Sequence, residues 1–416
     1  MSFSRDFSST APFLGMNGII CVRSQRCSAQ LARGVTSVDY DDSPEEADFR
    51  TNLRVWLEDN RPDPPPPLWE TAATHEYKTK WLSTLYDGGW VGLSWPVEYG
   101  GRGLSPLYEA ILNEELGAAG VPNAASSVGF LGRAILAYGT EIQKREFLPP
   151  LLRGESSWCE GFSEPEAGSD LASLRTFAER RGDVYVLNGQ KLWTGGAQFA
   201  DRCLLLARTD RNVPKHQGIT AFVLRMDSPG VTVRPILQAW GGSRFCEVFF
   251  DNVEVPVDDR LGDEGKGWEL ATVVLAYERG PTELGVVATH RGELRRLSVG
   301  LLQNDTAADE AFARAWIAVE ACRLHLLESL TRRSTGEAPG PSSSVGKLLM
   351  ICAEQKIGTL ELDSSEVKAI TGEDRQASTR YVWARASSVY GGAEQIQKNI
   401  IAQRVLGLPR PRPKGE

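Results

Sequence analysis

The chain has 416 residues, of which 41% are apolar and 24% charged, and its formal net charge is -8. These values are typical of globular proteins, and the length predicts two to three domains of roughly 150 residues each. The acidic balance argues against a surface for nucleic acids or anionic membranes. The sequence has no apolar run of about 18 residues, so we expect no membrane span.

Cysteine and histidine usage bears on the compartment and on metals. The seven cysteines are scattered and odd in number, and the chain has four histidines. No close Cys or His pair has the spacing of metal ligands, so we expect no metal site. Thiols in such a pattern are typical of a reduced, cytoplasmic protein.

Residues 1–38 differ in composition from the rest of the chain. They are rich in serine and carry four arginines against the single acid Asp6. This composition is similar to that of an organellar transit peptide. Because no clear amphipathic face accompanies it, we expect a disordered N-terminal extension or an over-extended start instead.

A first helix is predicted to begin at Ser43. Pro44 follows at the first helical position, and Glu46 stands where a capping box places its acid. Further helical patterns run through 75–87, 105–120 and 140–152. We therefore expect an N-terminal helical domain over residues 39–155.

The apolar period changes to two between about residues 156 and 264. The run from Asp183 to Leu187 predicts a strand, and the following Asn188-Gly189 predicts a hairpin turn. Other strand-like runs lie at 203–208, 219–225, 231–237 and 246–255. We expect a middle, antiparallel β-domain over 156–264.

Long helical patterns return after Gly265 and predict a C-terminal helical bundle over 265–410, before a short tail at 411–416. The expected helices are 267–302, 306–333, 343–370 and 376–404. The order is helical, then β, then helical. The fold class is thus α+β and mainly α.

Two neighbouring segments carry the most specific signal. The first is GFSEPEAGSDL at 161–171, and the second is NGQKLWTGG at 188–196. Neither is a dinucleotide fingerprint or a phosphate loop. Ala167 and Gly168 add little bulk, so the backbone amides of the first segment can approach a large planar ligand closely. Trp193 in the second offers a rigid aromatic wall.

These segments strongly resemble the acyl-CoA dehydrogenase family of flavoproteins. Further similar pieces are WPVEYGGRG at 95–103, NEEL at 113–116, YGTEIQK at 138–144, FFDNVEVP at 249–256 and YGGAEQIQKNII at 390–401. Several motifs in one order, over roughly residues 44 to 410, are a specific signal. The resemblance implies an acyl-CoA dehydrogenase-like order of domains, with a flavin between the β-domain and the C-terminal bundle.

The resemblance also implies FAD as the cofactor and suggests which residues bind it. Ser163, beside Phe162, is similar to the hydroxyl residue at the flavin pyrimidine edge. Ser169 is similar to the residue that touches both the flavin phosphate and the pantetheine arm of the substrate, and Trp193 to the indole that packs on the isoalloxazine. The other residues carried over are Gly168, Thr194, Gly195, Ala393 and Gln395 for the cofactor, and Gly391 and Gly392 for the substrate.

Oxidation of a thioester across its α–β bond needs a base for the α-proton and an acceptor for the β-hydride. No side chain accepts hydride, so a flavin is required. In the family the base is a Glu at one of two places. The commoner place corresponds to Gly391, which has no proton acceptor, and the second corresponds to Glu278, followed by Arg279. By composition alone Glu278-Arg279 is an ordinary solvated pair, but the vacant first place favours Glu278 as base, tuned by Arg279.

Three departures from the family pattern leave other functions open. Gly195 and Ala393 stand where the family has hydroxyl residues. An Arg-x-x-Phe-Gly segment, which in the family reaches a neighbouring subunit's flavin, is missing between Arg291 and Phe312. One alternative is a weakly catalytic or non-catalytic partner subunit of a mixed acyl-CoA dehydrogenase oligomer. Another is a flavin oxidase or monooxygenase on the same fold.

For the leading hypothesis, the resemblance implies an acyl-CoA or acyl-carrier-protein thioester as substrate and an α,β-enoyl thioester as product. It implies electron-transfer flavoprotein or a similar acceptor for the electrons. A homodimer or homotetramer is expected, with a hetero-oligomer as the alternative. The identity of the acyl group is not readable from the sequence.

Overall fold

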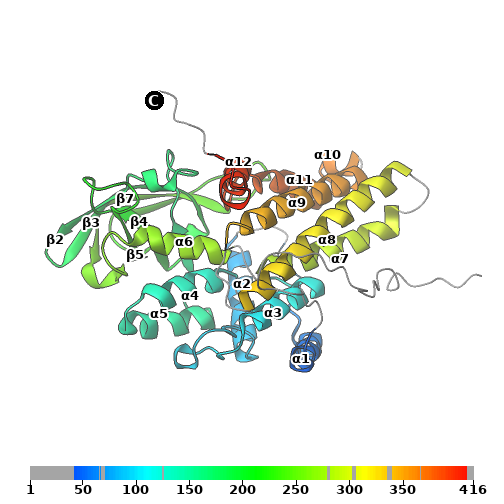
Figure 1. The fold of residues 1–416 in the computed structure, drawn as a ribbon, viewed down its shortest axis with the longest axis horizontal. Helices are drawn as coiled ribbons and strands as arrows, with labels where there is room; N and C mark the ends of the chain where they lie inside the picture. Colours follow the sequence, from blue (N-terminus) through cyan, green and yellow to red (C-terminus); the bar gives the residue numbers. More distant parts are fainter. Residues whose placement is uncertain are drawn as a thin grey trace, which may run out of the picture. The chain divides into compact units, whose positions relative to one another are not determined.

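The computed structural model describes residues 42–64, 66, 71–123, 126–278, 282–301, 306–334, 340–365 and 367–409 (Figure 1). The expected N-terminal extension and the tail at 411–416 lie outside these residues. None of the helices within the described ranges is long and apolar enough to cross a membrane.

The first part of the described chain is helical. Its helices are α1 (Pro44–Asn60), α2 (Ala72–Asp87), α3 (Pro106–Ala119), α4 (Ser126–Tyr138) and α5 (Glu141–Arg153). The capping box predicted at the start of α1 is confirmed, since Ser43 and Glu46 exchange side-chain to backbone hydrogen bonds. Helix α4 was not predicted, because Gly129 and Gly132 weaken its helical pattern. A Cβ at Gly132 would collide with the Trp95 ring, so this glycine permits close packing.

The middle part is one eight-stranded sheet, in the order β6-β7-β3-β2-β4-β5-β8 with β1 paired to β4. Its strands are β1 (Trp158–Gly161), β2 (Phe177–Arg181), β3 (Val184–Gly195), β4 (Arg202–Arg208), β5 (Ile219–Arg225), β6 (Val231–Pro235), β7 (Phe245–Pro256) and β8 (Arg260–Leu261). Most neighbours are antiparallel, but β1 and β2 run parallel to β4. Short 3₁₀ turns lie at Val97–Tyr99, Leu171–Ser173, Ala197–Phe199 and Val257–Asp259.

The prediction of a hairpin turn at Asn188-Gly189 is wrong. Strand β3 continues through both residues and pairs with β7 before and after them, with a register shift between Leu187 and Gly189. Gly189 has a φ of 151°, and a Cβ there would lie 2.6 Å from the Thr176 hydroxyl oxygen. The glycine therefore serves a close approach inside the sheet. The turn from β2 to β3 lies at Gly182, whose φ is 65°.

Strands β4 and β5 show how the sheet is covered on both faces. Leu204, Leu206 and Val223 belong to an apolar core that also contains residues of α4 and α6. Leu205 and Phe222, which alternate with them, belong to a second core within the β-domain. Alternate side chains of a strand point to opposite faces, so the helices cover one face of these strands.

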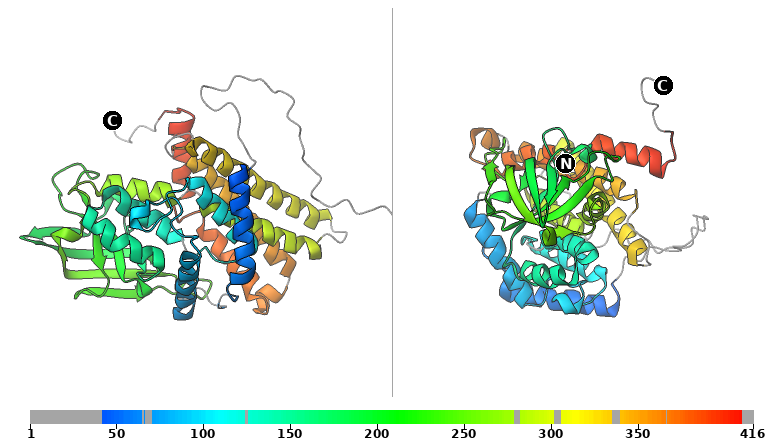
Figure 2. Two further views of the ribbon diagram at one scale, coloured as in Figure 1. Left: turned by 90° about the horizontal axis from the view of Figure 1, so that it is seen from below. Right: turned by 90° about the vertical axis from the view of Figure 1, so that its left-hand side faces the viewer.

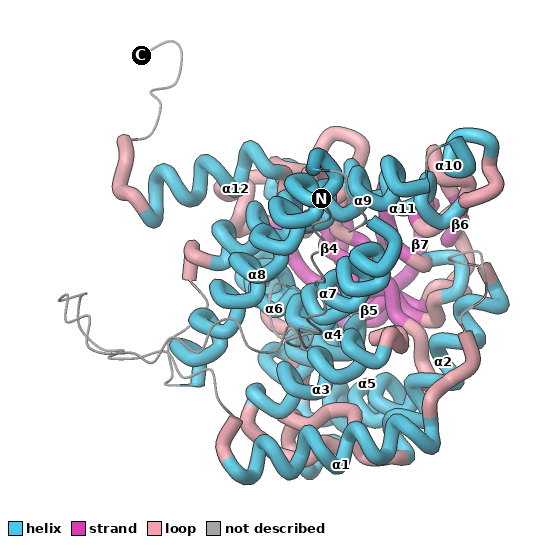
Figure 3. The backbone as a smooth tube through the Cα atoms, turned by 90° about the vertical axis from the view of Figure 1, so that its right-hand side faces the viewer, coloured by secondary structure: helices cyan, strands magenta, loops and turns pink. Residues whose placement is uncertain are grey.

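The last part is a helical bundle. Its helices are α6 (Gly267–Glu278), α7 (Thr282–Leu301), α8 (Thr306–Ser334), α9 (Ser343–Ser365), α10 (Val367–Thr371), α11 (Arg375–Ala386) and α12 (Glu394–Ile400), which ends in a π turn at Ile401–Val405. Helices α7, α8 and α9 lie side by side (Figure 2). Helix α3 packs closely on α7 (Figure 3), because Gly117 meets the Gly285 backbone without a side chain between them.

One of the long helices expected here is interrupted within the described residues. The expected helices 267–302 and 343–370 correspond to α6 with α7 and to α9 with α10, and the residues between the members of each pair lie outside the described part of the chain. The pattern at 376–404 is broken between α11 and α12, where Gly391 and Gly392 have φ values of 61° and 99°. Apolar periodicity continues across such breaks, so it could not reveal them. The broken segment borders the cleft described below.

Candidate active site

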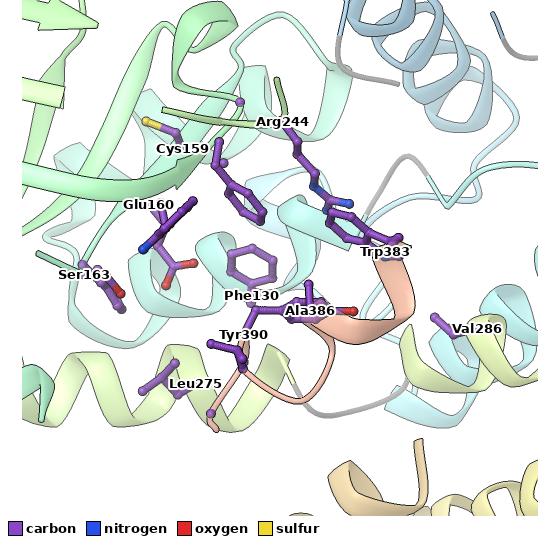
Figure 4. A pocket seen from close by; sticks show the side chains of 18 of the residues that line it. Phe130, Cys159, Glu160, Ser163, Arg244, Leu275, Val286, Trp383, Ala386 and Tyr390 are labelled. Atoms are coloured by element: carbon purple, nitrogen blue, oxygen red, sulfur yellow. The ribbon is translucent and has the colours of Figure 1, made fainter. Parts of the chain in front are cut away.

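A cleft of about 2500 Å³ is lined by the helical first part, the β-domain and the C-terminal bundle (Figure 4). It collects most of the predicted site residues. Those that line it are Phe162, Ser163, Gly168, Ser169, Trp193, Gly195, Gly391, Gly392 and Ala393. Thr194 is buried beside the cleft, whereas Gln395 is exposed and does not line it.

The loop 162–176, which carries Ser163 and Ser169, is held by buried charges. The Glu164 carboxylate accepts the backbone N–H groups of Arg175 (2.6 Å) and Thr176 (2.9 Å). It also pairs with the Lys191 ammonium at 2.8 Å, and that ammonium donates to the Phe162 carbonyl at 3.0 Å. The backbone of the loop is therefore tied to strand β3 at several points.

Glu164 and Lys191 form a clamp on this loop, and electrostatics keeps the Glu164 carboxylate ionised. Burial alone would raise the pKa of Glu164, but the Lys191 ammonium and the hydrogen bonds from Thr176 and Arg175 outweigh it and hold the pKa below its usual value. Arg208 completes the clamp, donating to the Leu174 carbonyl at 3.1 Å and to the Ala172 carbonyl at 2.7 Å. The loop keeps its shape through contacts within the protein.

Trp193 combines exposure with an unusual backbone. Its φ is 63°, in the left-handed region that non-glycine residues rarely adopt, and its side chain is 54% exposed. The ring meets Phe245 edge to face, with centroids 6.2 Å apart. Backbone strain of this kind tends to occur at ligand sites. The indole is thus held at the edge of the cleft.

Aromatic rings continue from Trp193 toward the C-terminal bundle. Phe245 stacks on Trp383 with centroids 6.3 Å apart, and Trp383 lies 5.7 Å from the Tyr390 ring. The Arg244 guanidinium lies 4.9 Å from the centre of the Trp383 ring. Arg244, Trp383 and Tyr390 all line the cleft (Figure 4). Together these rings form an apolar wall with a cation beside it.

The residues around the cleft fit a large planar ligand with polar edges. The buried side-chain atoms here that have no hydrogen-bond partner among the described residues include Thr194 Oγ1, Trp240 Nε1 and Gln397 Oε1. Trp240 and Gln397 line the cleft itself. Buried polar atoms are nearly always hydrogen-bonded in native proteins, so a ligand is the natural partner. The two serines of the 162–176 loop add further hydrogen-bonding groups.

The expected base is only partly placed. Glu278 is the last residue of α6, but its side chain lies outside the described part of the structure, as does Arg279 altogether. Leu275, one turn earlier on α6, lines the cleft (Figure 4). Gly391 also lines it, with a left-handed backbone that disfavours larger residues.

Several polar residues of the cleft were not found by sequence reasoning. Glu160 of β1 lines it with Phe130 and Ser163 (Figure 4), and His290, Glu354 and Arg380 line it from α7, α9 and α11. Strand alternation places Glu160 and Phe162 on one face of the chain, which was a usable signal. The other three come from separate helices, whose packing no local pattern reveals.

Comparison with known proteins places the chain in a family. Residues 43–155, 159–253 and 265–406 match the N-terminal, middle and C-terminal domains of acyl-CoA dehydrogenases. The chain belongs to the acyl-CoA dehydrogenase family. It is therefore a flavoprotein oxidoreductase, and the recognition of the family and of its mainly helical α+β fold is confirmed.

Individual relatives agree. The chain is 38% identical over 385 residues to acyl-CoA dehydrogenase IpdE1 of Mycobacterium tuberculosis, covering 87% of this chain and 98% of the relative. It superposes on the Tcur3481-Tcur3483 steroid ACAD with a TM-score of 0.78 and 28% identity, covering 90% of this chain and all of the other. The ChsE4-ChsE5 complex from Mycobacterium tuberculosis gives a TM-score of 0.75 at 28% identity, with the same coverage.

Proposed function

We propose that the protein oxidises an acyl-CoA or acyl-carrier-protein thioester to its α,β-enoyl thioester, with FAD as cofactor. The observation that carries this proposal is the convergence of Ser163, Ser169 and Trp193 on one cleft, in a chain that matches all three family domains. FAD supplies the two-electron acceptor for the hydride.

The residues of this chain have separable tasks. The 162–176 loop presents Ser163 and Ser169 to the cofactor, and Trp193 and the wall behind it exclude water from one side of the cleft. Glu278 takes the α-proton of the thioester, and Arg279 tunes its basicity. The position of Leu275 on the cleft supports this assignment, because Glu278 follows one turn later on α6.

We infer a bulky acyl group. The cleft of about 2500 Å³ must also hold FAD and the CoA arm, so its total volume does not set the size of the acyl group, but Gly391 and Gly392 occupy little of the space beside Tyr390. A steroid ACAD is among the similar structures. Both observations favour a branched or ring-bearing acyl chain over a short straight one.

A second candidate is a subunit of a mixed oligomer, and the ChsE4-ChsE5 complex among the similar structures favours it. In that arrangement a partner chain completes the flavin site in place of the Arg-x-x-Phe-Gly segment that the sequence lacks. The leading proposal includes a cytoplasmic location for the protein and an electron-transfer flavoprotein as its electron acceptor.

The purified protein tests both candidates. We expect a bound yellow cofactor, released on denaturation as FAD, that is bleached without oxygen by some member of a panel of acyl-CoA thioesters. A folded protein that stays colourless when FAD is added would contradict the leading proposal and favour the partner subunit. Rapid reoxidation of the reduced cofactor by air would indicate an oxidase instead.

A further inference from the structure

A buried histidine faces the cleft with a ring nitrogen that makes no hydrogen bond to any described residue. His290, on α7, is only 7% exposed and lines the cleft. Its Nδ1 lies 3.0 Å from the Glu293 carboxylate, whereas its Nε2 has no hydrogen-bond partner within the described part of the chain. Val286, one turn earlier (Figure 4), and the adjacent Thr289 line the cleft as well, so this side of α7 borders it.

The surrounding charges anchor one side of the ring. Arg380 of α11 pairs with Glu293 and, at 3.1 Å, with Glu361 of α9. Burial would raise the pKa of Glu293, but His290 and Arg380 more than compensate and hold it below its usual value. Glu293 is thus an ionised acceptor, so Nδ1 of His290 carries a proton. This ion pair network accounts for the packing of the three helices without using Nε2.

The other side of the ring defines what it can bind. Glu354 of α9 also lines the cleft, and its Oε1 lies 4.0 Å from His290 Nε2, too far for a hydrogen bond. A hydroxyl group can bond to either form of the ring. It donates to Nε2 of the neutral ring, or it accepts from the protonated ring while donating to Glu354. A keto oxygen can bond only to the protonated ring and cannot donate to Glu354, and the three carboxylates of the cluster outnumber Arg380 and oppose an anion.

We propose that His290, with Glu354, is a specificity-determining residue that recognises a hydroxyl group on the acyl part of the substrate. This inference rests on the proposed function, since it takes the acyl thioester to lie in the same cleft. A site built to bind a hydroxyl discriminates against the analogue without it, because its buried polar atoms are then left unpaired.

The test uses ω-hydroxyacyl-CoA thioesters of increasing chain length, each compared with the unsubstituted acyl-CoA of that length. At the length that reaches His290, we expect the wild type to favour the hydroxylated thioester in kcat/KM and in Kd by about tenfold. Asparagine can keep the hydrogen bond that Nδ1 makes but removes Nε2, so His290→Asn should abolish the preference. Glutamine can place an amide where Nε2 lies, so His290→Gln should restore part of it.

Glu361→Gln is the matched control. It removes the ion pair between Arg380 and Glu361, and Glu361 does not line the cleft, so the preference should remain intact. The proposal is overturned if the wild type shows no preference at any length, or if His290→Asn weakens both members of a pair equally. A wild type that prefers an ω-aminoacyl-CoA to the ω-hydroxyacyl-CoA of the same length also overturns the proposal. Equal binding of all the thioesters overturns it too and would mean that Nε2 of His290 binds only a water molecule.

Binding and turnover separate this inference from the function on which it rests. If the thioesters bind but none reduces the flavin, the dehydrogenase function fails, while the calorimetric Kd values of wild type and His290→Asn still decide the role of His290. If the flavin is reduced and no hydroxyl preference exists, only the inference about His290 fails.

Discussion

Gly195 has room for the hydroxyl that the family pattern expects there. A Cβ built on it would lie 3.7 Å from the Phe245 ring, an ordinary van der Waals distance. We therefore expect Gly195→Ser to fold normally and to tighten flavin binding, because the added hydroxyl supplies one hydrogen bond, worth about 1 kcal/mol or roughly fivefold in Kd. Fluorescence titration of the flavin-free proteins with FAD measures it. Gly195→Ala is the control, and equal tightening by alanine would show that the hydroxyl is not responsible.

Glu278→Gln should leave the flavin bound but stop turnover. Glutamine keeps the size of the side chain and cannot accept the α-proton, so we expect kcat to fall by about 10²- to 10⁴-fold. Single-turnover reduction of the flavin by a true substrate is the measurement. Glu394→Gln is the comparison, since Glu394 pairs with Lys398 at 2.6 Å and does not line the cleft. Near wild-type reduction by Glu278→Gln would refute the assignment of the base.

The Glu164 clamp predicts a pH dependence of stability. Because the pKa of Glu164 in the folded protein lies below its ordinary value of 4.5, the ionised carboxylate stabilises the fold above that pH. This contribution is lost as the pH falls through the folded pKa. Glu164→Gln should cost about 3–5 kcal/mol at neutral pH, since it leaves buried Lys191 without its counter-charge. Urea unfolding of both proteins at several pH values should show this difference shrinking on acidification below 4.5; a constant difference would contradict the clamp.

Helix α12 begins without a side-chain cap. Ala393 is its N-cap residue, with an extended backbone and no side chain that can accept a hydrogen bond. Ala393→Thr should raise the free energy of unfolding by about 1 kcal/mol, because threonine can accept a backbone N–H of the first turn. Thermal unfolding of the flavin-free protein isolates this effect from cofactor binding. Ala393→Val has a similar shape and no hydroxyl, so an equal gain from valine would argue against capping.

The helices and strands show which elements local patterns reveal. The capping signal at Ser43 and the continuous apolar runs of β4 and β5 suffice to predict those elements. Helix α4 was not predicted because Gly132 serves packing against Trp95, which is a tertiary contact. Likewise, Asn188-Gly189 has the composition of a turn but lies within a strand, where the close approach of Thr176 leaves no space for a side chain at residue 189.

The candidate site divides in the same way. The residues near Ser163 and Trp193 lie in continuous motifs, so a resemblance could point to them. His290, Glu354 and Trp383 come from three helices of the bundle and meet only through its packing. Their roles therefore needed the arrangement of helices, which a single sequence does not specify.

Assembly should govern how firmly the protein retains its cofactor. The sequence lacks the Arg-x-x-Phe-Gly segment with which the family reaches a neighbouring subunit's flavin, so we expect the isolated chain to lose flavin on dilution. Gel filtration with absorbance detection of protein and flavin measures the retained fraction. Tight retention by an isolated monomer would contradict this expectation. Recovery of retention on adding a partner chain would favour the mixed oligomer.

The clamp around the 162–176 loop also determines what happens when the cofactor is absent. Glu164, Lys191 and Arg208 hold the loop through bonds to the protein itself, so the shape of the loop does not depend on bonds to a ligand. A preorganised site does not spend binding free energy on arranging its own backbone. Flavin exchange should then proceed as simple docking, with the empty protein able to take up cofactor again without refolding.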